Sequence, residues 1–226
     1  MLELSKSLVL FAAGSSVIVE VEESCRRLGL EVAAVVRNVP GASFALAADR
    51  VIEPAQITRA HIDLPVVIPL FGPARRQGAL KDARRLGFTE FATLVDPTAI
   101  VASSARLGAG VYVNAGVTLG GASRFGRFVF VNRGAVLGHH LDIGDFVSIG
   151  PGAILAGEVS LGRGAVIGAG ATLLPKVKVG ANSVISAGAV VTKDLPDHCL
   201  AAGNPARIVK RGIVGYGGVA VEEHTV

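Results

Sequence analysis

The sequence predicts a chain in two parts, an α/β domain over about the first ninety residues and a repetitive β solenoid after it. Two observations carry this prediction. From Val101 to Val191, sixteen positions spaced six residues apart are all apolar, and no insertion breaks the register. Ahead of this repeat, a short apolar run, a glycine turn, a helical segment and a second apolar run follow the order of a βαβ unit.

The six-residue period is specific to a solenoid. Glycine follows the apolar position nine times, and a second small or apolar residue comes two positions before it. A period of six fits neither an amphipathic helix nor a two-residue strand alternation, and a Gly/Val-rich β-sandwich would not hold the register for so long. Three hexapeptides would form one coil, which places residues 18 apart in sequence above one another at roughly 4.8 Å. Glycine or asparagine is expected at the corners, where φ is positive.

Composition limits the classes of function. The chain has 226 residues, 29 glycines, no tryptophan and a net charge of +4. Its basic residues are dispersed, so no nucleic-acid partner is expected, although some could meet phosphate-bearing ligands. The two cysteines, Cys25 and Cys199, are far apart, which suits a reducing compartment. No apolar run of 18 residues and no secretory leader is recognisable, so we expect a soluble, cytoplasmic protein without a membrane span.

The first ninety residues predict strands at 7–12, 31–36 and 66–70, and helices at 17–28 and 73–86. The turn after the first strand holds Gly14 and Ser15, where a phosphate could meet a helix N-terminus. Its single glycine makes a weak dinucleotide fingerprint. Arg37, after the second strand, could face a phosphate or lie in a solvated loop.

Domain boundaries follow from a change of pattern. Pro97 suits the start of a strand, so we place the boundary near residue 93. The predicted parts are residues 1–92, the coils at 93–206 and a C-terminal tail at 207–226. The glycine-rich and then acidic stretch from residue 212 onward is expected to be loosely ordered.

Within the repeat from Val101 to Val191 the only histidines are His139 and His140. His139 comes two places after the inward Leu137, so its side chain should point away from the core. Its stacking neighbours, 18 residues away on either side, are Gly121 and Gly157. This arrangement suits a general base with open space beside it and a backbone N–H at Gly157 for a developing oxyanion. The alternative is a surface histidine at an exposed corner.

These coils resemble the left-handed parallel β-helix of hexapeptide-repeat acyltransferases, and residues 93–206 resemble the sugar O- and N-acetyltransferases. That family includes the sialic-acid O-acetyltransferases and bacillosamine N-acetyltransferases. Asn132 precedes His139 by seven residues, as an asparagine does in that family. Three further stretches carry the resemblance: Asp96-Pro97-Thr98-Ala99, the run from Gly144 to Ala153, and Gly203-Asn204-Pro205-Ala206-Arg207.

The resemblance implies direct acetyl transfer from acetyl-CoA to an amine or hydroxyl of a nucleotide-linked sugar, with no metal. It assigns His139 as general base, the Gly157 N–H to the oxyanion and Asn132 to positioning. It places CoA in a groove along the coils and the acceptor on a Rossmann-like N-terminal domain. The implied CoA contacts are Ser148, Gly157, Ala169 and Ala187, and the implied acceptor contacts are Gly14, Ser15, Arg37 and His140. A homotrimer with active sites between subunits is also implied.

The chain departs from the family pattern at four places. The first turn lacks the usual glycine-rich, His-containing sequence, and Arg37-Asn38 replaces an acidic pair. His140 stands where an acidic residue is usual, and Ser148 where relatives often have histidine. Two alternatives therefore remain. One is a non-catalytic scaffold or ligand-binding protein with a degenerate nucleotide pocket. The other is a γ-type carbonic anhydrase, for which the coils offer two adjacent histidines where three zinc ligands across an interface are needed.

Overall fold

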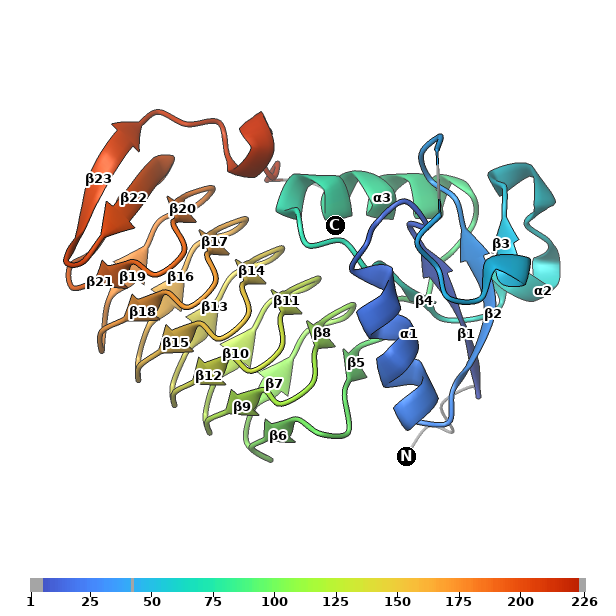
Figure 1. Cartoon of the computed structure of the whole chain (residues 1–226), viewed down its shortest axis with the longest axis horizontal. Coiled ribbons are helices and arrows are strands. Elements are labelled where there is room, and N and C mark those ends of the chain that lie inside the picture. The colour runs from blue at the N-terminus through green and yellow to red at the C-terminus, as the bar shows by residue number, and fades with distance from the viewer. Residues whose placement is uncertain (1–5, 42, 224–226) are drawn as a thin grey trace.

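The computed structural model describes residues 6–41 and 43–223 and shows a three-layer α/β unit packed against a three-sided stack of coils (Figure 1). The α/β unit has one parallel sheet in the order β3-β2-β1-β4. Its strands are β1 (Ser7–Phe11), β2 (Glu31–Val36), β3 (Val51–Ile52) and β4 (Val66–Val67). Its helices are α1 (Ile18–Arg27), α2 (Arg59–Ile62) and α3 (Pro73–Arg85), with 3₁₀ turns η1 (Ala48–Arg50) and η2 (Pro54–Gln56).

Successive side chains of β1 point to opposite faces of the sheet, and helices cover both faces, which gives three layers. Leu8 and Leu10 pack with Ile18 and Val21 of α1, whereas Val9 and Phe11 face the α3 side of the sheet. The predicted strands and long helices are confirmed, except that the strand expected at 66–70 has only two residues. The sequence did not predict β3 or α2. Because β2 and β4 flank β1 on opposite sides, the carboxyl ends of β1 and β4 form a crevice at a topological switch point.

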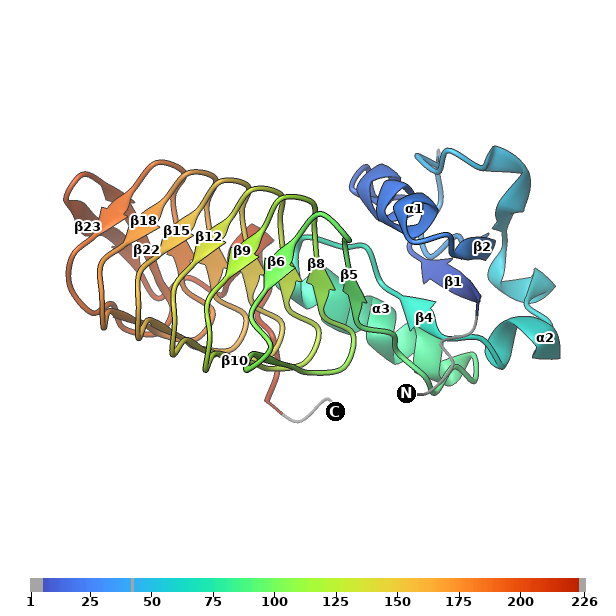
Figure 2. The same ribbon diagram turned by 90° about the horizontal axis from the view of Figure 1, so that it is seen from below.

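The coils form three parallel sheets, and Figure 2 shows them stacked in register. Sheet 1 contains β5 (Leu94–Val95), β8 (Tyr112–Val113), β11 (Phe130–Val131), β14 (Ser148–Ile149), β17 (Val166–Ile167), β20 (Val184–Ile185), β22 (Cys199–Gly203) and the antiparallel β23 (Ala206–Arg211). Sheet 2 contains β6 (Ile100–Val101), β9 (Thr118–Leu119), β12 (Val136–Leu137), β15 (Ile154–Leu155), β18 (Thr172–Leu173) and β21 (Val190–Val191). Sheet 3 contains β7 (Arg106–Leu107), β10 (Arg124–Phe125), β13 (Asp142–Ile143), β16 (Ser160–Leu161) and β19 (Lys178–Val179).

The predicted register is confirmed. Paired residues along the coils are 18 apart, as in Phe130↔Ser148 and Val136↔Ile154. All sixteen apolar positions of the repeat are the second residues of strands β6 to β21. Their side chains fill one continuous aliphatic core.

The coil glycines form two groups. The expected positive φ is confirmed for one group and for one asparagine: Gly110, Gly116, Gly134, Gly152, Gly164, Gly170, Gly188 and Asn182. The glycines directly after the aliphatic position avoid a steric clash, because a Cβ on Gly108 would lie 2.6 Å from the carbonyl oxygen of Gly126 in the next coil. Positive φ falls two residues later, and there it is adopted by residues as bulky as Phe128 (φ 54°) and His140 (φ 55°). Asn132, which also lies at a corner, does not have positive φ.

The three outward faces of the coils differ in chemistry. Sheet 1 carries Tyr112 and Phe130, which are buried against the α/β unit. Sheet 3 presents charged side chains, among them Arg124 and Asp142. Sheet 2 presents apolar side chains to solvent, with Ile100, Val136 and Ile154 exposed by 69%, 48% and 43%.

Arg76 of α3 joins the two parts of the chain. Its guanidinium is 1% exposed and donates to the carbonyls of Phe128, Phe146 and Val147 on the coils. It also donates to the carbonyls of Leu70 and Phe71, just ahead of its own helix. Burial lowers the pKa of Arg76 to about 9, so the group remains a cation at neutral pH. Its hydrogen bonds fix the segment before α3 on sheet 1.

A second buried junction centres on Asp96. Arg27 donates to Oδ2 of Asp96 at 2.6 and 2.9 Å, and Ser24 donates to the same atom at 2.6 Å. Thr98 donates to Oδ1 through its hydroxyl and its N–H. Burial raises the pKa of Asp96, but the hydrogen bonds from Arg27, Ser24 and Thr98 outweigh it and lower the pKa to about 2. A single carboxylate thereby ties α1 to the first coil.

The C-terminal tail is packed rather than loosely ordered over its described residues. It returns from β23 along the coils to α3 (Figure 1). Val221 is 2% exposed and exchanges hydrogen bonds with the amide of Asn182 on the coils. Glu222 pairs with Lys81 of α3 at 2.7 Å. The tail therefore bridges the coils and the α/β unit.

Candidate active site

His139 lies at the corner that follows sheet 2, and its imidazole covers Gly157 of the next coil. A Cβ on Gly157 would lie 2.6 Å from Cε1 and 2.8 Å from Nε2 of His139. Only glycine at position 157 therefore lets this ring lie where it does. His139 is exposed, and no group of the described residues forms a hydrogen bond with its Nε2.

The second nitrogen of that ring is engaged. Nδ1 of His139 lies 3.0 Å from Nδ1 of His140, and the two rings meet edge to face. Asp142 and Asp145, the acidic residues nearest to His139 in the sequence, are paired with arginines. Asp142 lies 3.9 Å from Arg124, and Asp145 lies 2.9 Å from Arg127. The corner is therefore a histidine pair and not a histidine–carboxylate pair.

The backbone N–H of Gly157 lies on the same corner as the imidazole. Its carbonyl accepts a hydrogen bond from Lys176 N–H, whereas no oxygen of the described residues accepts one from its own N–H. A peptide N–H in this state can donate to an incoming oxygen. His139 and Gly157, two of the predicted catalytic residues, are thus brought together within one chain.

Asn132 lies at the other edge of sheet 2, at the corner after sheet 1. Its Oδ1 accepts from Asn114 Nδ2 at 3.1 Å and from the N–H of Arg133 at 2.8 Å. With the oxygen occupied, its amide NH₂ remains for a ligand. Asn132 lines a groove of about 390 Å³ together with Ala169 and Ala187, both exposed at corners of successive coils.

A second cavity, of about 630 Å³, lies at the crevice between the carboxyl ends of β1 and β4. Gly14 and Ser15 line it, as the sequence predicts, and so do Gly72 and Arg75 from the N-terminal end of α3. The N-terminus of that 13-residue helix and the guanidinium of Arg75 both favour an anion here.

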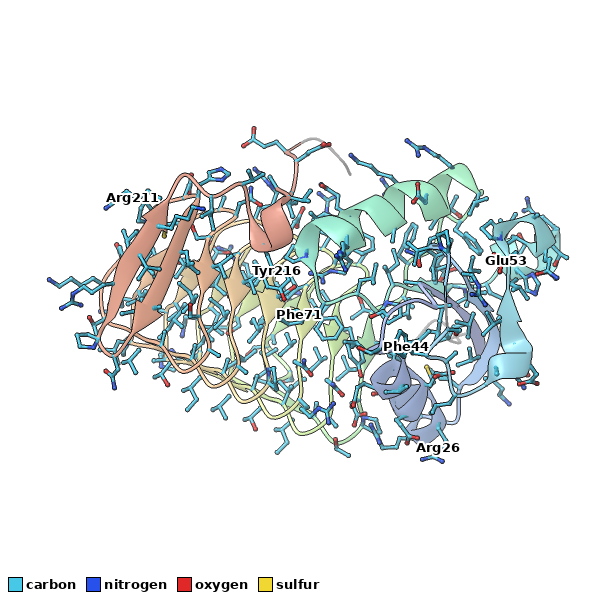
Figure 3. The ribbon with its side chains drawn as sticks, turned by 45° about the horizontal axis from the view of Figure 1, so that its top comes forward. Arg26, Phe44, Glu53, Phe71, Arg211 and Tyr216 are labelled. Atoms are coloured by element: carbon cyan, nitrogen blue, oxygen red, sulfur yellow. The ribbon has the colours of Figure 1, made fainter. Side chains whose placement is uncertain are left out.

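Phe71 and Tyr216 line both the groove and this cavity. Their rings meet edge to face with centroids 6.0 Å apart, and Figure 3 shows them at the junction of the tail, the start of α3 and the coils. The groove and the cavity of one chain are therefore adjacent, and the Phe71–Tyr216 pair lies between them. No role for Phe71 or Tyr216 was predicted from the sequence.

Comparison with known proteins agrees with this geometry. Residues 158–193 match the model of the bacterial transferase hexapeptide family (six repeats). Perosamine N-acetyltransferase from Caulobacter crescentus, solved in complex with CoA and GDP-perosamine as a histidine-to-asparagine variant, is 34% identical with a TM-score of 0.80. The match covers 90% of this chain and 97% of that one. The chain belongs to the hexapeptide-repeat sugar acetyltransferases.

Two further structures extend the comparison for this acetyltransferase. The acetyltransferase domain of PglB from Neisseria gonorrhoeae, in complex with acetyl coenzyme A, is 28% identical with a TM-score of 0.80, over 91% of this chain and all (100%) of that one. WeeI from Acinetobacter baumannii, at 22% identity and a TM-score of 0.77 over 90% of this chain and 100% of that one, shares the fold. A search of curated protein sequences returns no match.

Two predicted contacts of the acetyltransferase lie elsewhere. Ser148 was expected to contact CoA, but it is fully buried, donates to the carbonyl of Phe71 and accepts from Arg76. It has this environment because it is an outward residue of sheet 1, the face that the α/β unit covers. Arg37 was expected beside the acceptor, but it pairs with Glu53 at 2.8 Å and does not line the cavity.

Two classes of site receive no support from the described residues. In residues 6–41 and 43–223, no group of three His, Cys, Asp or Glu side chains could hold a metal ion. No helix in this part of the acetyltransferase has the length and apolar character needed to cross a membrane.

Proposed function

We propose that this acetyltransferase moves an acetyl group from acetyl-CoA to an amino group, or failing that a hydroxyl, of a nucleotide-linked sugar. The observation that carries the proposal is the exposed ring of His139 over Gly157, with Nε2 free of hydrogen bonds from the described residues and a backbone N–H beside it. The relatives named above, solved with CoA, acetyl coenzyme A and GDP-perosamine, favour an amine as acceptor.

The acceptor nucleotide belongs in the 630 Å³ cavity of what we propose is a Rossmann-like domain. Ligands of parallel α/β sheets bind at the carboxyl ends of strands at a switch point, which is where this cavity lies. The diphosphate would face the N-terminus of α3 and Arg75 rather than Arg37. With the nucleotide there, the sugar would extend past Phe71 and Tyr216 toward the groove.

Acetyl-CoA belongs in the groove along the corners after sheet 1, on what we propose is a left-handed β-helix. Ala169 and Ala187 present only methyl groups at this surface, which leaves a channel for a narrow pantetheine chain. The amide NH₂ of Asn132 would donate to a carbonyl of CoA or to the acceptor. Ser148 is removed from the set of contacts.

The chemistry follows from the groups at the His139 corner. The sugar amine attacks the thioester carbonyl carbon, and Nε2 of His139 accepts a proton from the amine nitrogen. The N–H of Gly157 donates to the oxyanion of the tetrahedral adduct. When the adduct collapses, the C–S bond breaks and His139 returns its proton to the leaving thiolate. The products are the N-acetylated sugar and free CoA thiol.

A homotrimer would complete this site. Within one chain, His139 and the groove lie at opposite edges of sheet 2, with strand β12 between them. Sheet 2 is also the apolar, uncovered face, which a second and third copy would bury. Packing of these faces around a threefold axis would bring the His139 corner of one subunit to the groove and aromatic pair of the next. The nucleotide cavity, the groove and a neighbouring base would then converge.

The activity is tested by measuring thiol release from acetyl-CoA with a panel of UDP-, GDP- and CMP-linked amino sugars and sialic acids. Release with one acceptor, abolished in His139→Ala, is the expected result. If no acceptor supports release and acetyl-CoA does not bind, the protein is not an acetyltransferase of this kind.

The assembly is tested with Ile154→Glu, which places a charge on sheet 2. Its matched control is Ser160→Glu, at the equivalent outward position of the next hexapeptide on sheet 3. We expect light scattering to give monomers for Ile154→Glu, with activity lost and circular dichroism retained, and trimers for Ser160→Glu. A trimeric, active Ile154→Glu protein would contradict the proposed interface.

A further inference from the structure

We infer that His140 is a positioning residue whose Nδ1 selects the tautomer of His139 in which Nε2 is free to accept a proton. This inference rests on the proposed acetyl transfer and replaces the expected contact of His140 with the acceptor. It also answers how the base is oriented in a chain that has no acidic residue after it.

The proton count of the pair leads to this assignment. The two Nδ1 atoms lie 3.0 Å apart, a hydrogen-bond distance, so one of them carries the proton and the other accepts it. If Nδ1–H of His139 donates, its neutral ring has a lone pair on Nε2. If Nδ1–H of His140 donates, His139 carries its proton on Nε2 and cannot act as a base there. Only the first arrangement supports the reaction.

Catalysis itself favours that arrangement. When Nε2 of His139 takes the proton from the attacking amine, the ring becomes a cation with Nδ1–H still directed at His140. A hydrogen bond from a cationic donor is shorter and roughly twice as strong as one between neutral groups. The contact is therefore stronger in the transition state than in the resting enzyme, which is the requirement for a rate contribution.

The coil backbone holds both rings in place. The N–H of His140 donates to the carbonyl of Gly121 at 2.9 Å, and the carbonyl of His139 accepts from the N–H of Glu158 at 2.9 Å. His140 has φ 55°, a left-handed conformation that turns the chain sharply between the two side chains. Backbone hydrogen bonds to the preceding and the following coil therefore fix the position of the His139–His140 dipeptide.

No other charged group takes the place of His140 among the described residues. The charged side chains stacked on His140 in the following coils are Glu158 and Lys176, and neither forms a hydrogen bond or ion pair with His139. On the same strand segment, Asp142 faces Arg124. In residues 6–41 and 43–223, Nδ1 of His139 therefore has His140 as its one hydrogen-bond partner.

Substitutions at position 140 must use residues that tolerate its positive φ of 55°. His140→Gly removes the imidazole without strain, because glycine tolerates positive φ. His140→Asn also tolerates positive φ and offers an amide oxygen that can accept from Nδ1–H. The matched control is Lys176→Gly, which has φ 67° at the equivalent corner two coils away.

Three measurements on the full-length enzyme are made together. Steady-state kinetics give kcat and KM for acetyl-CoA and for the active acceptor. Imidazole ¹⁵N spectra of the wild type and each position-140 variant, with His139 assigned by comparison with His139→Ala, report which nitrogen carries the proton. Circular dichroism and light scattering check the fold and the assembly.

We expect His140→Gly to lower kcat by about 10- to 100-fold with KM unchanged, by analogy with the loss that follows removal of the hydrogen-bonding partner of a metal-bound histidine. The His139 spectrum should shift toward the Nε2–H tautomer. His140→Asn should restore both properties in large part, and Lys176→Gly should match the wild type.

Other outcomes overturn the inference while leaving acetyl transfer intact. An active His140→Gly enzyme with an unchanged His139 spectrum would show that His140 does not select the tautomer. A raised acceptor KM without a tautomer shift would return His140 to acceptor binding. If His139→Ala transfers acetyl groups at the wild-type rate, the proposed base itself is wrong, which is a separate failure.

Discussion

Replacing Gly157 by alanine tests the His139 corner with a single methyl group. The new Cβ would lie 2.6 Å from Cε1 and 2.8 Å from Nε2 of His139, and its three nearest atoms all belong to that ring. Carbon atoms in contact lie about 3.5 Å or more apart, so the imidazole must retreat by about 0.9 Å. The ring is exposed and can move, and Gly157 does not have positive φ, so alanine adds no backbone strain.

The expected result is a folded enzyme with a misplaced base. A displacement of about 1 Å can lower a rate about 100-fold, which corresponds to about 2.7 kcal/mol in the activation free energy. The free energy of unfolding should change by no more than about 0.5 kcal/mol, as for other surface substitutions. The assay is thiol release at saturating acetyl-CoA, together with thermal unfolding of the same preparation.

The matched control is Gly121→Ala, two coils earlier at the same corner. Its Cβ would meet Oγ of Ser104 at 2.9 Å and would have no atom of His139 within 4 Å. We expect this variant to keep its activity. Wild-type turnover in Gly157→Ala, or an equal loss in both variants, would refute the placement of the base over Gly157.

Three further predictions concern the junctions between the α/β unit and the coils. The pKa of Asp96 is about 2 in the folded chain, below its ordinary value of 3.8, so its stabilisation is complete above pH 4 and disappears as the pH falls toward 2. Asp96→Asn should remove this part of the pH dependence, on the order of 2 kcal/mol, in thermal unfolding between pH 2 and 5. Arg76→Ala should lower the free energy of unfolding by about 3 kcal/mol or more, measured by urea denaturation, because several buried carbonyls lose their donor. Tyr216→Ala should raise KM for both substrates by about two- to tenfold with kcat kept, since an aromatic pair contributes about 0.5–1.5 kcal/mol; unchanged KM values would exclude Tyr216 from both pockets.

The coils could be predicted almost residue by residue because their physics is local and periodic. Every sixth side chain must fill the core, so the register of β6 to β21 can be read directly from the aliphatic positions. The stacking of His139 on Gly157 follows from the same 18-residue arithmetic. Short elements of the α/β unit, such as β3 and α2, have no period to identify them.

The errors concern contacts between distant segments. Ser148 was expected at a ligand groove, yet α3 covers its face of the coil and Arg76 binds its hydroxyl. The expectation of a loose tail followed from its glycines, yet Val221 is held by Asn182, a contact that spans 39 residues. Repeat spacing predicts which residues point outward. It cannot predict which of the outward faces another part of the chain covers.

The orientation of Asn132 shows how the two parts of the chain act on one site. Ser24 of α1 donates to Asp96 and lies 2.9 Å from the hydroxyl of Tyr112, which donates to Oδ1 of Asn114 at 3.0 Å. Asn114 in turn donates to Oδ1 of Asn132. Each link is buried or nearly so, where an unmade hydrogen bond is costly, so the amide of Asn132 cannot flip without leaving polar groups unpaired. The backbone N–H groups of Ala115 and Arg133 hold the two amide oxygens in the same orientation, so the chain of hydrogen bonds from α1 supports a donor that the coils already direct to the groove.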